Sequence, residues 1–218
     1  MLKVDSIKYS YEQENTINNY DFSCFIKESE IVGIIGSSGS GKSTLLDLIA
    51  GFLTPTSGSI FFKEKEISSL DTEQRPLTIL FQKYNTFEHL SVIKNVLLGI
   101  STSLKPKKEE LLEAKEILKE VGLTGFENKL ASSLSGGQSQ RVALARSLIK
   151  KTPILLLDEP FTGLDLDSRN KMLKLLKNIS KRRKLYTIIV THELNDCKSI
   201  ANRVYEVSRG KLYEKEVF

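Results

Sequence analysis

The 218-residue chain has little cysteine and no apolar run long enough to cross a membrane. Its continuous apolar stretches, such as residues 154–157, fall far short of the ~18 residues that a spanning helix needs. The first residues also lack the long apolar segment of a signal peptide. Any membrane role is therefore expected to come through a partner. Neither Cys24 nor Cys197 has a Cys or His nearby at metal-ligand spacing, so both are predicted to be buried free thiols.

The sequence also has no low-complexity tract and no repeat of fixed period, which argues against a linker or a repeat array. Apolar residues make up 40% and charged residues 27%, as in an ordinary globular protein of one α/β domain. The net charge of +5 would suit an anionic partner. However, the densest basic cluster, residues 181–184, has no interleaved aromatic residues. We read it as the solvated end of a helix and expect no nucleic-acid partner.

Hydrophobic periodicity predicts strands alternating with helices, which implies a parallel sheet covered on both faces. Strand patterns cover residues 2–7, 20–26, 31–35, 60–62, 78–81, 154–157 and 187–190, and residues 204–213 are predicted to form a terminal hairpin. Helical patterns cover residues 111–121, 142–149 and 172–179. Residues 84–149 contain helical patterns only, so this stretch is predicted to be a helical insertion.

A glycine-rich loop follows the apolar strand pattern at 31–35 and precedes a helical pattern, which is the context of a phosphate-binding loop. Its residues are Gly36, Ser37, Ser38, Gly39, Ser40, Gly41, Lys42, Ser43 and Thr44. Glycines let successive backbone N–H groups turn toward phosphate oxygens, and the helix N-terminus adds partial positive charge. Lys42 is predicted to reach the β- and γ-phosphates, and the Ser43 hydroxyl to ligate Mg²⁺. The loop indicates a nucleoside triphosphate but not the use made of its energy.

Two carboxylates, Asp158 and Glu159, follow the apolar run at 154–157, at the strand edge where ligands of open α/β sheets bind. Asp158 is predicted to hold Mg²⁺, and Glu159 to polarise the water that attacks the γ-phosphate. His192 ends another apolar strand pattern beside this site and is predicted to hydrogen-bond the γ-phosphate. His89 has no such placement and is interpreted as a surface residue.

The segment Leu134-Ser135-Gly136-Gly137-Gln138 resembles the LSGGQ signature of ABC ATPases, and residues 140–146 continue the similarity. A Ser and two Gly at a helix start also predict a second phosphate-binding helix N-terminus. The resemblance extends over residues 2–212. It implies an α/β P-loop NTPase (RecA-like) core with an antiparallel β-subdomain and an inserted helical signature subdomain. The expected single domain spans 1–218, with core and β-subdomain in 1–83 and 150–218, the helical subdomain in 84–149, and no C-terminal regulatory domain.

The same resemblance implies roles for four further positions. Gln82 resembles the Q-loop glutamine that ligates Mg²⁺ and senses the membrane subunit, and Asp165 lies in a D-loop-like segment. His192 resembles the switch histidine of this family, and Tyr11 resembles the aromatic residue that stacks on adenine. Tyr9 is close by, and an aromatic residue in a strand also commonly serves in packing, so both readings of Tyr11 stay open.

In this family two subunits dimerise head to tail, with each ATP between the phosphate loop of one and the signature helix of the other. The resemblance therefore implies ATP with Mg²⁺, a second copy of this chain, and ABC permease subunits as direct partners. A periplasmic or extracellular solute-binding protein is an indirect partner. The expected location is the cytoplasmic face of the inner (plasma) membrane, reached through the permease subunits.

Several stretches resemble importers more than exporters. Residues 158–165 are similar to the importer pattern DEPFSALD, and residues 81–96 to that of ferric-iron, polyamine, molybdate and thiamine importers. Residues 48–58 and 75–82 resemble thiamine-import ATPases most. Thiamine or a similar small organic cation is thus the favoured solute. A ferric-iron or polyamine importer is the alternative, and a lipoprotein-release exporter is less favoured. Ser29, Ser139 and the pair Tyr84-Asn85 depart from the usual family residues.

Two other classes share the signature helix. SMC or repair-type ATPases insert long heptad coiled coils between their half-motifs, whereas no sustained heptads separate Lys42 from Ser135 here. Ribosome-acting ABC proteins carry two ATPase halves in one chain, and this chain has one. The transport ATPase is therefore the favoured reading.

Overall fold

The computed structural model describes residues 1–13, 16–82, 86–101 and 106–216, and within them one mixed sheet runs through the molecule. Its strands are β1 (Leu2–Gln13), β2 (Thr16–Ile26), β3 (Ile31–Ile35), β4 (Ser57–Phe62), β5 (Lys65–Glu66), β6 (Leu77–Leu80), β7 (Ile154–Asp158), β8 (Tyr186–Val190), β9 (Arg203–Ser208) and β10 (Lys211–Lys215). Their order is β5-β4-β1-β2-β10-β9-β3-β8-β7-β6. The order divides the sheet into two halves of different character.

One half is parallel and the other is antiparallel. Strands β9, β3, β8, β7 and β6 pair in parallel, and β3 and β8 are buried at every position. Strands β2, β1, β4 and β5 pair antiparallel. Strand β10 joins the halves, since it is antiparallel to β9 and pairs with β2 through Lys211 and Asp21. The predicted terminal hairpin is therefore confirmed. Its second strand, β10, also connects the parallel strands with the antiparallel strands.

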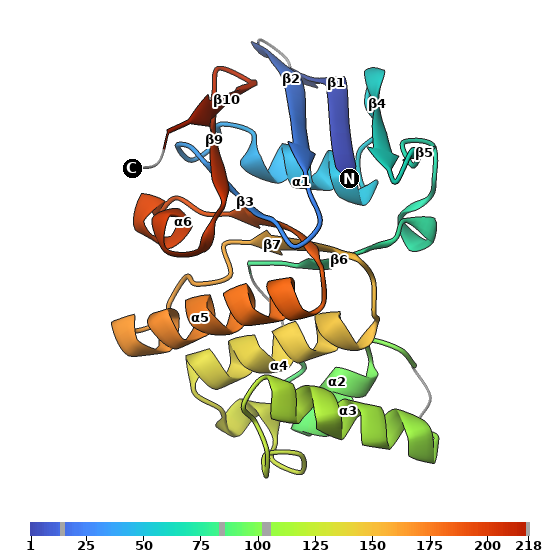
Figure 1. Ribbon diagram of the computed structural model, residues 1–218, viewed down its shortest axis with the longest axis vertical. Helices are drawn as coiled ribbons and strands as arrows, with labels where there is room; N and C mark the ends of the chain where they lie inside the picture. Colours follow the sequence, from blue (N-terminus) through green and yellow to red (C-terminus); the bar gives the residue numbers. More distant parts are fainter. Residues whose placement is uncertain (14–15, 83–85, 102–105, 217–218) are drawn as a thin grey trace.

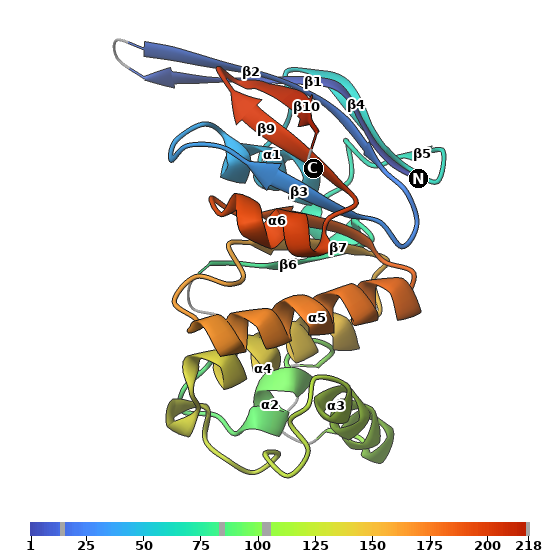
Figure 2. The same ribbon diagram turned by 60° about the vertical axis from the view of Figure 1, so that its left-hand side comes forward.

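The helices form layers against this sheet. They are α1 (Lys42–Ala50), α2 (Val92–Leu97), α3 (Lys108–Glu120), α4 (Gly136–Ile149), α5 (Leu166–Arg182) and α6 (Leu194–Ile200). Helix α1 lies between the antiparallel strands and the parallel strands, whereas α4 and α5 lie on the opposite side, with α2 and α3 beyond them (Figures 1 and 2). The described residues between β6 and β7 thus contain helices α2, α3 and α4 and no named strand, which agrees with the predicted helical insertion. The predicted boundary between the core and the helical subdomain lies at residues 83–84. Residues 83–85 are outside the described part of the chain, so this boundary stays a prediction.

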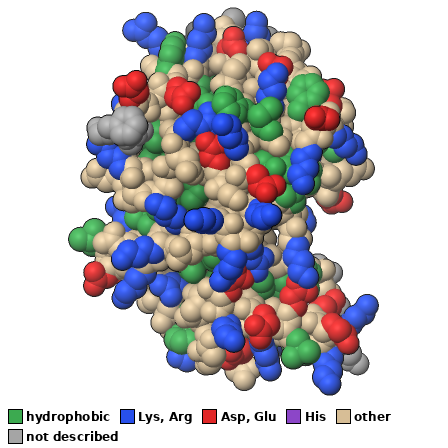
Figure 3. Space-filling model, viewed as in Figure 1, with side chains coloured by type: hydrophobic (Ala, Val, Ile, Leu, Met, Phe, Trp, Pro, Cys, Tyr) green, Lys and Arg blue, Asp and Glu red, His purple; other side chains and the backbone are tan. Residues whose placement is uncertain are grey.

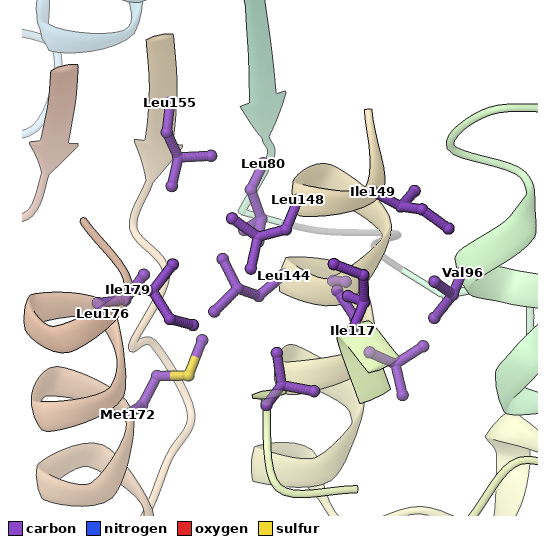
Figure 4. Close-up of a cluster of buried hydrophobic side chains, with 14 of the residues drawn as sticks. Leu80, Val96, Ile117, Leu144, Leu148, Ile149, Leu155, Met172, Leu176 and Ile179 are labelled. Atoms are coloured by element: carbon purple, nitrogen blue, oxygen red, sulfur yellow. The ribbon is translucent and has the colours of Figure 1, made fainter. Parts of the chain in front are cut away.

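Two hydrophobic clusters occupy the two faces of the parallel strands. One cluster packs α1 against both halves of the sheet, with Leu45 and Leu48 among Phe22, Ile60 and Ile188. The other packs α2 to α5 against the opposite face; Figure 4 shows Leu80 and Leu155 of the strands facing Leu144, Leu148, Met172 and Leu176. Continuous apolar strands are required here because helices cover both faces.

The helix α5 shows why the basic cluster of the sequence is a solvated face. Met172, Leu173, Leu176 and Ile179 are buried, while Lys171, Lys174, Lys177, Lys181 and Lys184 are exposed. Lysine and arginine side chains accordingly gather on the surface over α5 (Figure 3). Within the described ranges, no helix combines the length and apolar character required to traverse a bilayer.

Three details refine the sequence predictions. Cys24 and Cys197 are buried free thiols, and burial raises the pKa of each to about 12. Ser29 adopts φ = +62° in the turn before β3, which explains why glycine is usual at that position. The short helices α2 and α6 were not predicted.

Candidate functional site

The loop at residues 36–41 is shaped by close packing of its backbone. Gly41 adopts φ = +108°, and a Cβ there would lie 2.2 Å from Cε1 of Tyr20. Only glycine fits such a position without displacing the ring. Lys42 begins α1, is 8% exposed, and donates from Nζ to the carbonyls of Gly36 (2.9 Å) and Ser37 (2.8 Å). The loop thus curls around the lysine ammonium at a helix N-terminus, as an anion site requires.

The first acidic residue of the pair lies beside this loop. Asp158 ends β7, and its Oδ2 accepts a hydrogen bond from Ser43 Oγ at 3.4 Å. Burial, followed by the neighbouring charge of Glu159, raises the pKa of the Asp158 carboxyl, while the Ser43 hydroxyl acts in the opposite direction. A hydroxyl and a carboxylate therefore converge from α1 and β7, although the two residues are 115 positions apart.

The second acidic residue points elsewhere. Glu159 Oε2 lies 2.8 Å from His192 Nδ1, a distance at which the ring N–H donates to the carboxylate, and it accepts a second bond from Thr162 Oγ1 at 2.9 Å. The Glu159 side chain is 16% exposed and the His192 side chain 54%. The structure thus brings together Glu159 and His192, which the sequence placed near one site. It also adds Thr162, which the sequence analysis missed although it lies only three residues from Glu159.

The signature segment starts α4 with a reciprocal cap. Ser135 Oγ accepts from the Gln138 backbone N–H at 3.4 Å, and Gln138 Oε1 accepts from the Ser135 N–H at 3.0 Å. Gly136 and Ser135 are exposed. Asp165 is the corresponding N-cap of α5, and its Oδ1 accepts from the Ser168 N–H at 2.9 Å, a bond that lowers the pKa of its carboxyl.

The phosphate loop and the signature segment line two separate hollows of the surface. Ser37, Ser38, Gly39 and Ser40 line one hollow together with Asn19, Tyr20 and the β9–β10 turn. Gln82, Gly136, Ser139 and residues 162–164 line the other. The described residues of one chain therefore keep the phosphate loop and the signature helix in different hollows.

Tyr11 and Gln82 stand apart from the contacts that link Ser43 to Asp158 and Glu159 to His192. The Tyr11 ring packs edge-on against Tyr9 at 4.8 Å and against Tyr20 at 6.0 Å between ring centroids. This contact gives Tyr11 a packing role, and adenine stacking stays a prediction. Gln82 is exposed at the mouth of the second hollow. Of the departures from the family pattern, Ser139 Oγ hydrogen-bonds Thr86 Oγ1 at 2.9 Å, and Tyr84-Asn85 lies outside the described residues.

Comparison with known proteins places this geometry in a family. The ABC transporter family model matches residues 18–162. The thiamine import ATP-binding protein ThiQ of Vibrio cholerae is 41% identical over 97% of this chain and 87% of its own length, and that of Yersinia pseudotuberculosis is 43% identical over 97% and 88%.

Solved structures agree. A bacterial ABC transporter cassette, MJ0796, solved as a dimer, matches with a TM-score of 0.84 and 31% identity over 100% of this chain and 99% of that one. The same cassette in a dimeric post-hydrolysis state with ADP and Pi matches with a TM-score of 0.85. The match to the family model and to relatives over nearly the whole chain shows that the chain belongs to the ABC transporter family as an ATP-binding subunit.

Proposed function

We propose that this ABC ATPase hydrolyses ATP between two copies of itself to drive solute import through membrane subunits. The main support is the position of the Glu159 carboxylate. His192 and Thr162 both contact its Oε2, and the Ser43–Asp158 pair lies next to Glu159 along the chain. The other carboxylate oxygen, Oε1, then remains to orient and polarise a water molecule. In this scheme Lys42 and the loop amides bind the β- and γ-phosphates. His192 would hydrogen-bond the γ-phosphate.

The Ser43–Asp158 pair also fits Mg²⁺. Hydroxyl and carboxylate oxygens are hard ligands, and Mg²⁺ is commonly bound by one or two carboxylates together with substrate phosphates and water. The described residues contain no cluster of three His, Cys, Asp or Glu side chains that could hold a metal by themselves, which agrees with a cation shared with ATP. Ser43 would ligate the ion directly, Asp158 would hold it through water, and Gln82 is the third proposed ligand. The ion would neutralise charge on the phosphates.

A second copy of the chain is the first proposed partner. Ser135 and Gly136 are exposed at the N-terminus of α4, and Gly136 lines a different hollow from the phosphate loop. Backbone N–H groups at a helix N-terminus suit a phosphate, so a two-fold related copy would offer its signature helix to the ATP held by the first. The dimeric form of the related cassette supports this arrangement. Asp165 and its neighbours would then lie at the dimer contact.

Permease subunits are the second proposed partner. Phe52 and Phe81 are 49% and 45% exposed, with ring centroids 5.9 Å apart, and Phe81 adjoins Gln82. An exposed aromatic pair beside Gln82, which resembles a residue that senses the membrane subunit, suits an apolar protein partner. We propose that this partner is a permease, which would hold the ATPase at the cytoplasmic face of the inner membrane, with a solute-binding protein acting on the other side.

Thiamine is the solute that we propose, because the relatives from Vibrio cholerae and Yersinia pseudotuberculosis are both named for its import and the similarity spans nearly the whole chain. Ferric iron and polyamines are the alternatives. The test is uptake into proteoliposomes that contain the complex purified with its membrane subunits and binding protein. ATP-dependent uptake of labelled thiamine, but not of spermidine or Fe³⁺, is expected. Uptake of either alternative without thiamine would overturn the solute assignment.

The hydrolytic assignment has its own test in the same complex. Glu159→Gln should keep ATP binding and accumulate an ATP-bound dimer, because the amide cannot polarise the water, while hydrolysis falls by about 100-fold or more. Lys42→Ala should instead weaken nucleotide binding itself. Nucleotide titration and size-exclusion chromatography separate the two outcomes. Normal turnover by Glu159→Gln would contradict the role given to this carboxylate.

A further inference from the structure

The first turn of α5 touches three functional segments of the chain. Asp165 caps the helix. Ser168 packs against the signature glycine Gly137, where an added Cβ would lie 3.1 Å from the Ser168 side chain. Arg169 pairs with Asp196 of the third segment, α6, which directly follows the loop that carries His192. Because these contacts lie within one helical turn, a shift of the signature helix or of Asp165 also moves Arg169.

The contact between Arg169 and Asp196 is a bidentate ion pair. Arg169 Nε donates to Asp196 Oδ1 and Nη2 donates to Oδ2, both at 2.7 Å. The Asp196 side chain is 4% exposed and that of Arg169 26%, so water screens the pair weakly. The two residues come from α5 and α6. This geometry fixes the position of α6 relative to the first turn of α5 in two directions at once.

Asp196 continues the contact into the His192 loop. Thr191 Oγ1 donates to Asp196 Oδ2 at 3.5 Å and accepts from the Glu193 backbone N–H at 3.1 Å. Thr191 is 3% exposed. The residues on both sides of His192 are therefore tied to Asp196, and His192 itself contacts Glu159 at 2.8 Å.

We propose that Arg169 and Asp196 are positioning residues, which transmit the placement of the signature helix and of Asp165 to His192 and, through it, to Glu159. Neither residue touches the reacting atoms. The inference rests on the proposed function, in which Gly137 and Asp165 lie at the contact with a second copy of the chain. Closure of the dimer would then set the hydrolytic pair through the first turn of α5, so that hydrolysis follows closure.

The test compares variants of the full chain in the complex with its membrane subunits. Arg169→Met removes the guanidinium but keeps an unbranched side chain, and Arg169→Lys keeps the charge without the two-pronged geometry. For Arg169→Met we expect kcat to fall about tenfold to a hundredfold, with KM for ATP and ATP-induced dimerisation nearly unchanged, because His192 is misplaced while the phosphate loop is intact. The kcat of Arg169→Lys should lie between those of Arg169→Met and the wild type.

A double-mutant cycle distinguishes positioning from a general loss of stability. If Arg169 acts through His192, then adding Arg169→Met to His192→Ala should cost no further activity in single-turnover assays. The control is Glu120→Gln, which breaks an ion pair of Glu120 with Arg182 and Arg183 at the other end of α5. It should leave kcat within about twofold of the wild type, since the contacts that the structure describes at that end reach α3 and the C-terminal end of α4 rather than the residues assigned to the site.

The outcomes separate the two proposals. A wild-type complex without ATP hydrolysis would overturn the proposed function. An active wild type with an equally active, folded Arg169→Met variant, or with additive losses in the cycle, would overturn the positioning role alone. Should Arg169→Met fail to fold, Thr191→Val and Thr191→Ser serve the same purpose: loss of kcat in the valine variant and its retention in the serine variant are expected, and equal activity of both contradicts the inference.

Discussion

Glu159 has a backbone conformation that few residues adopt at the end of a strand. Its φ of +47° lies in the left-handed region, which is costly for a residue with a Cβ. The Glu159 N–H donates to the Val190 carbonyl at 2.9 Å, so β8 holds this conformation in place. Consecutive carboxylates thereby diverge: Asp158 points toward Ser43, and Glu159 points toward His192. One local distortion thus separates the proposed metal-holding role from the proposed water-orienting role.

The hydrogen bond from Thr162 to Glu159 can be tested by two substitutions. Thr162→Val preserves the shape of the side chain but removes the hydroxyl that donates to Glu159 Oε2. We expect kcat to fall about tenfold, the equivalent of one hydrogen bond of ~1.4 kcal/mol, with KM for ATP unchanged. Thr162→Ser, which keeps the hydroxyl, should retain activity. Steady-state ATP hydrolysis by the two variants checks this, and equal rates would show that the bond is not used.

At the element scale, Arg75 joins α1 to the segment before β6. It is 3% exposed and donates to four carbonyls, those of Leu48 and Ile49 at the end of α1 (2.7 Å each), Ser68 (2.7 Å) and Leu70 (3.0 Å). A cation is favourable at a helix C-terminus, where carbonyls lack partners. Arg75 therefore fixes the far end of the helix whose first residue is Lys42.

We expect Arg75→Met to lower the free energy of unfolding by about 3–5 kcal/mol, because four carbonyls lose their donor, two of them in buried hydrogen bonds. Arg75→Lys should rescue little of this loss, since an ammonium cannot reach all four acceptors. Urea unfolding monitored by circular dichroism measures the effect. Arg182→Met, at a side chain that is 62% exposed, is the control and should cost less than about 1 kcal/mol.

The elements differ in how far their sequence predicts them. The strand at 31–35, the loop after it and the helix beginning at Lys42 follow from apolar continuity and glycine placement alone. Helix α6 escapes prediction because it has seven residues and no side-chain cap at Glu193. The contacts of Arg75 with α1 and of Asp196 with Arg169 also escape it, because these partners are 26 or 27 positions apart and are brought near only by the tertiary fold. Sequence thus predicts the motifs, but not the polar contacts that hold them in place.

At the scale of the whole molecule, ion pairs join distant segments and make stability depend on pH. Glu30 before β3 pairs with Arg203 of β9, with the two side chains 10% and 17% exposed. Burial by itself raises the pKa of the Glu30 carboxyl, but the bonds from Arg203 and the Lys27 N–H outweigh it, so the pKa lies below its ordinary value of 4.5. A lowered folded-state pKa stabilises the fold above pH 4.5, and this contribution is lost as the pH falls below that value.

Glu30→Gln should therefore be less stable than the wild type near pH 7, by about 3 kcal/mol, and the difference should shrink on acidification below pH 4.5. Urea unfolding at a series of pH values measures both quantities. A difference that stays constant from pH 7 to pH 3 would show that Glu30 does not contribute through its charge. Exposed Glu64→Gln is the control, since it should give no such pH-dependent difference.

The pairing of β3 determines when this strand can find its neighbours during synthesis of the chain. Both neighbours of this strand, β8 and β9, come late in the chain: Ile31 is in register with Thr187, and Val32 with Arg203. At about 5–20 residues per second, a ribosome needs roughly 8–30 s to reach Thr187 after Ile31. During that interval the strand that leads into the phosphate loop has neither neighbour, so the nascent chain exposes a fully apolar segment. The proposed phosphate loop therefore gains the strands that flank β3 only after residues 187–203 have been made.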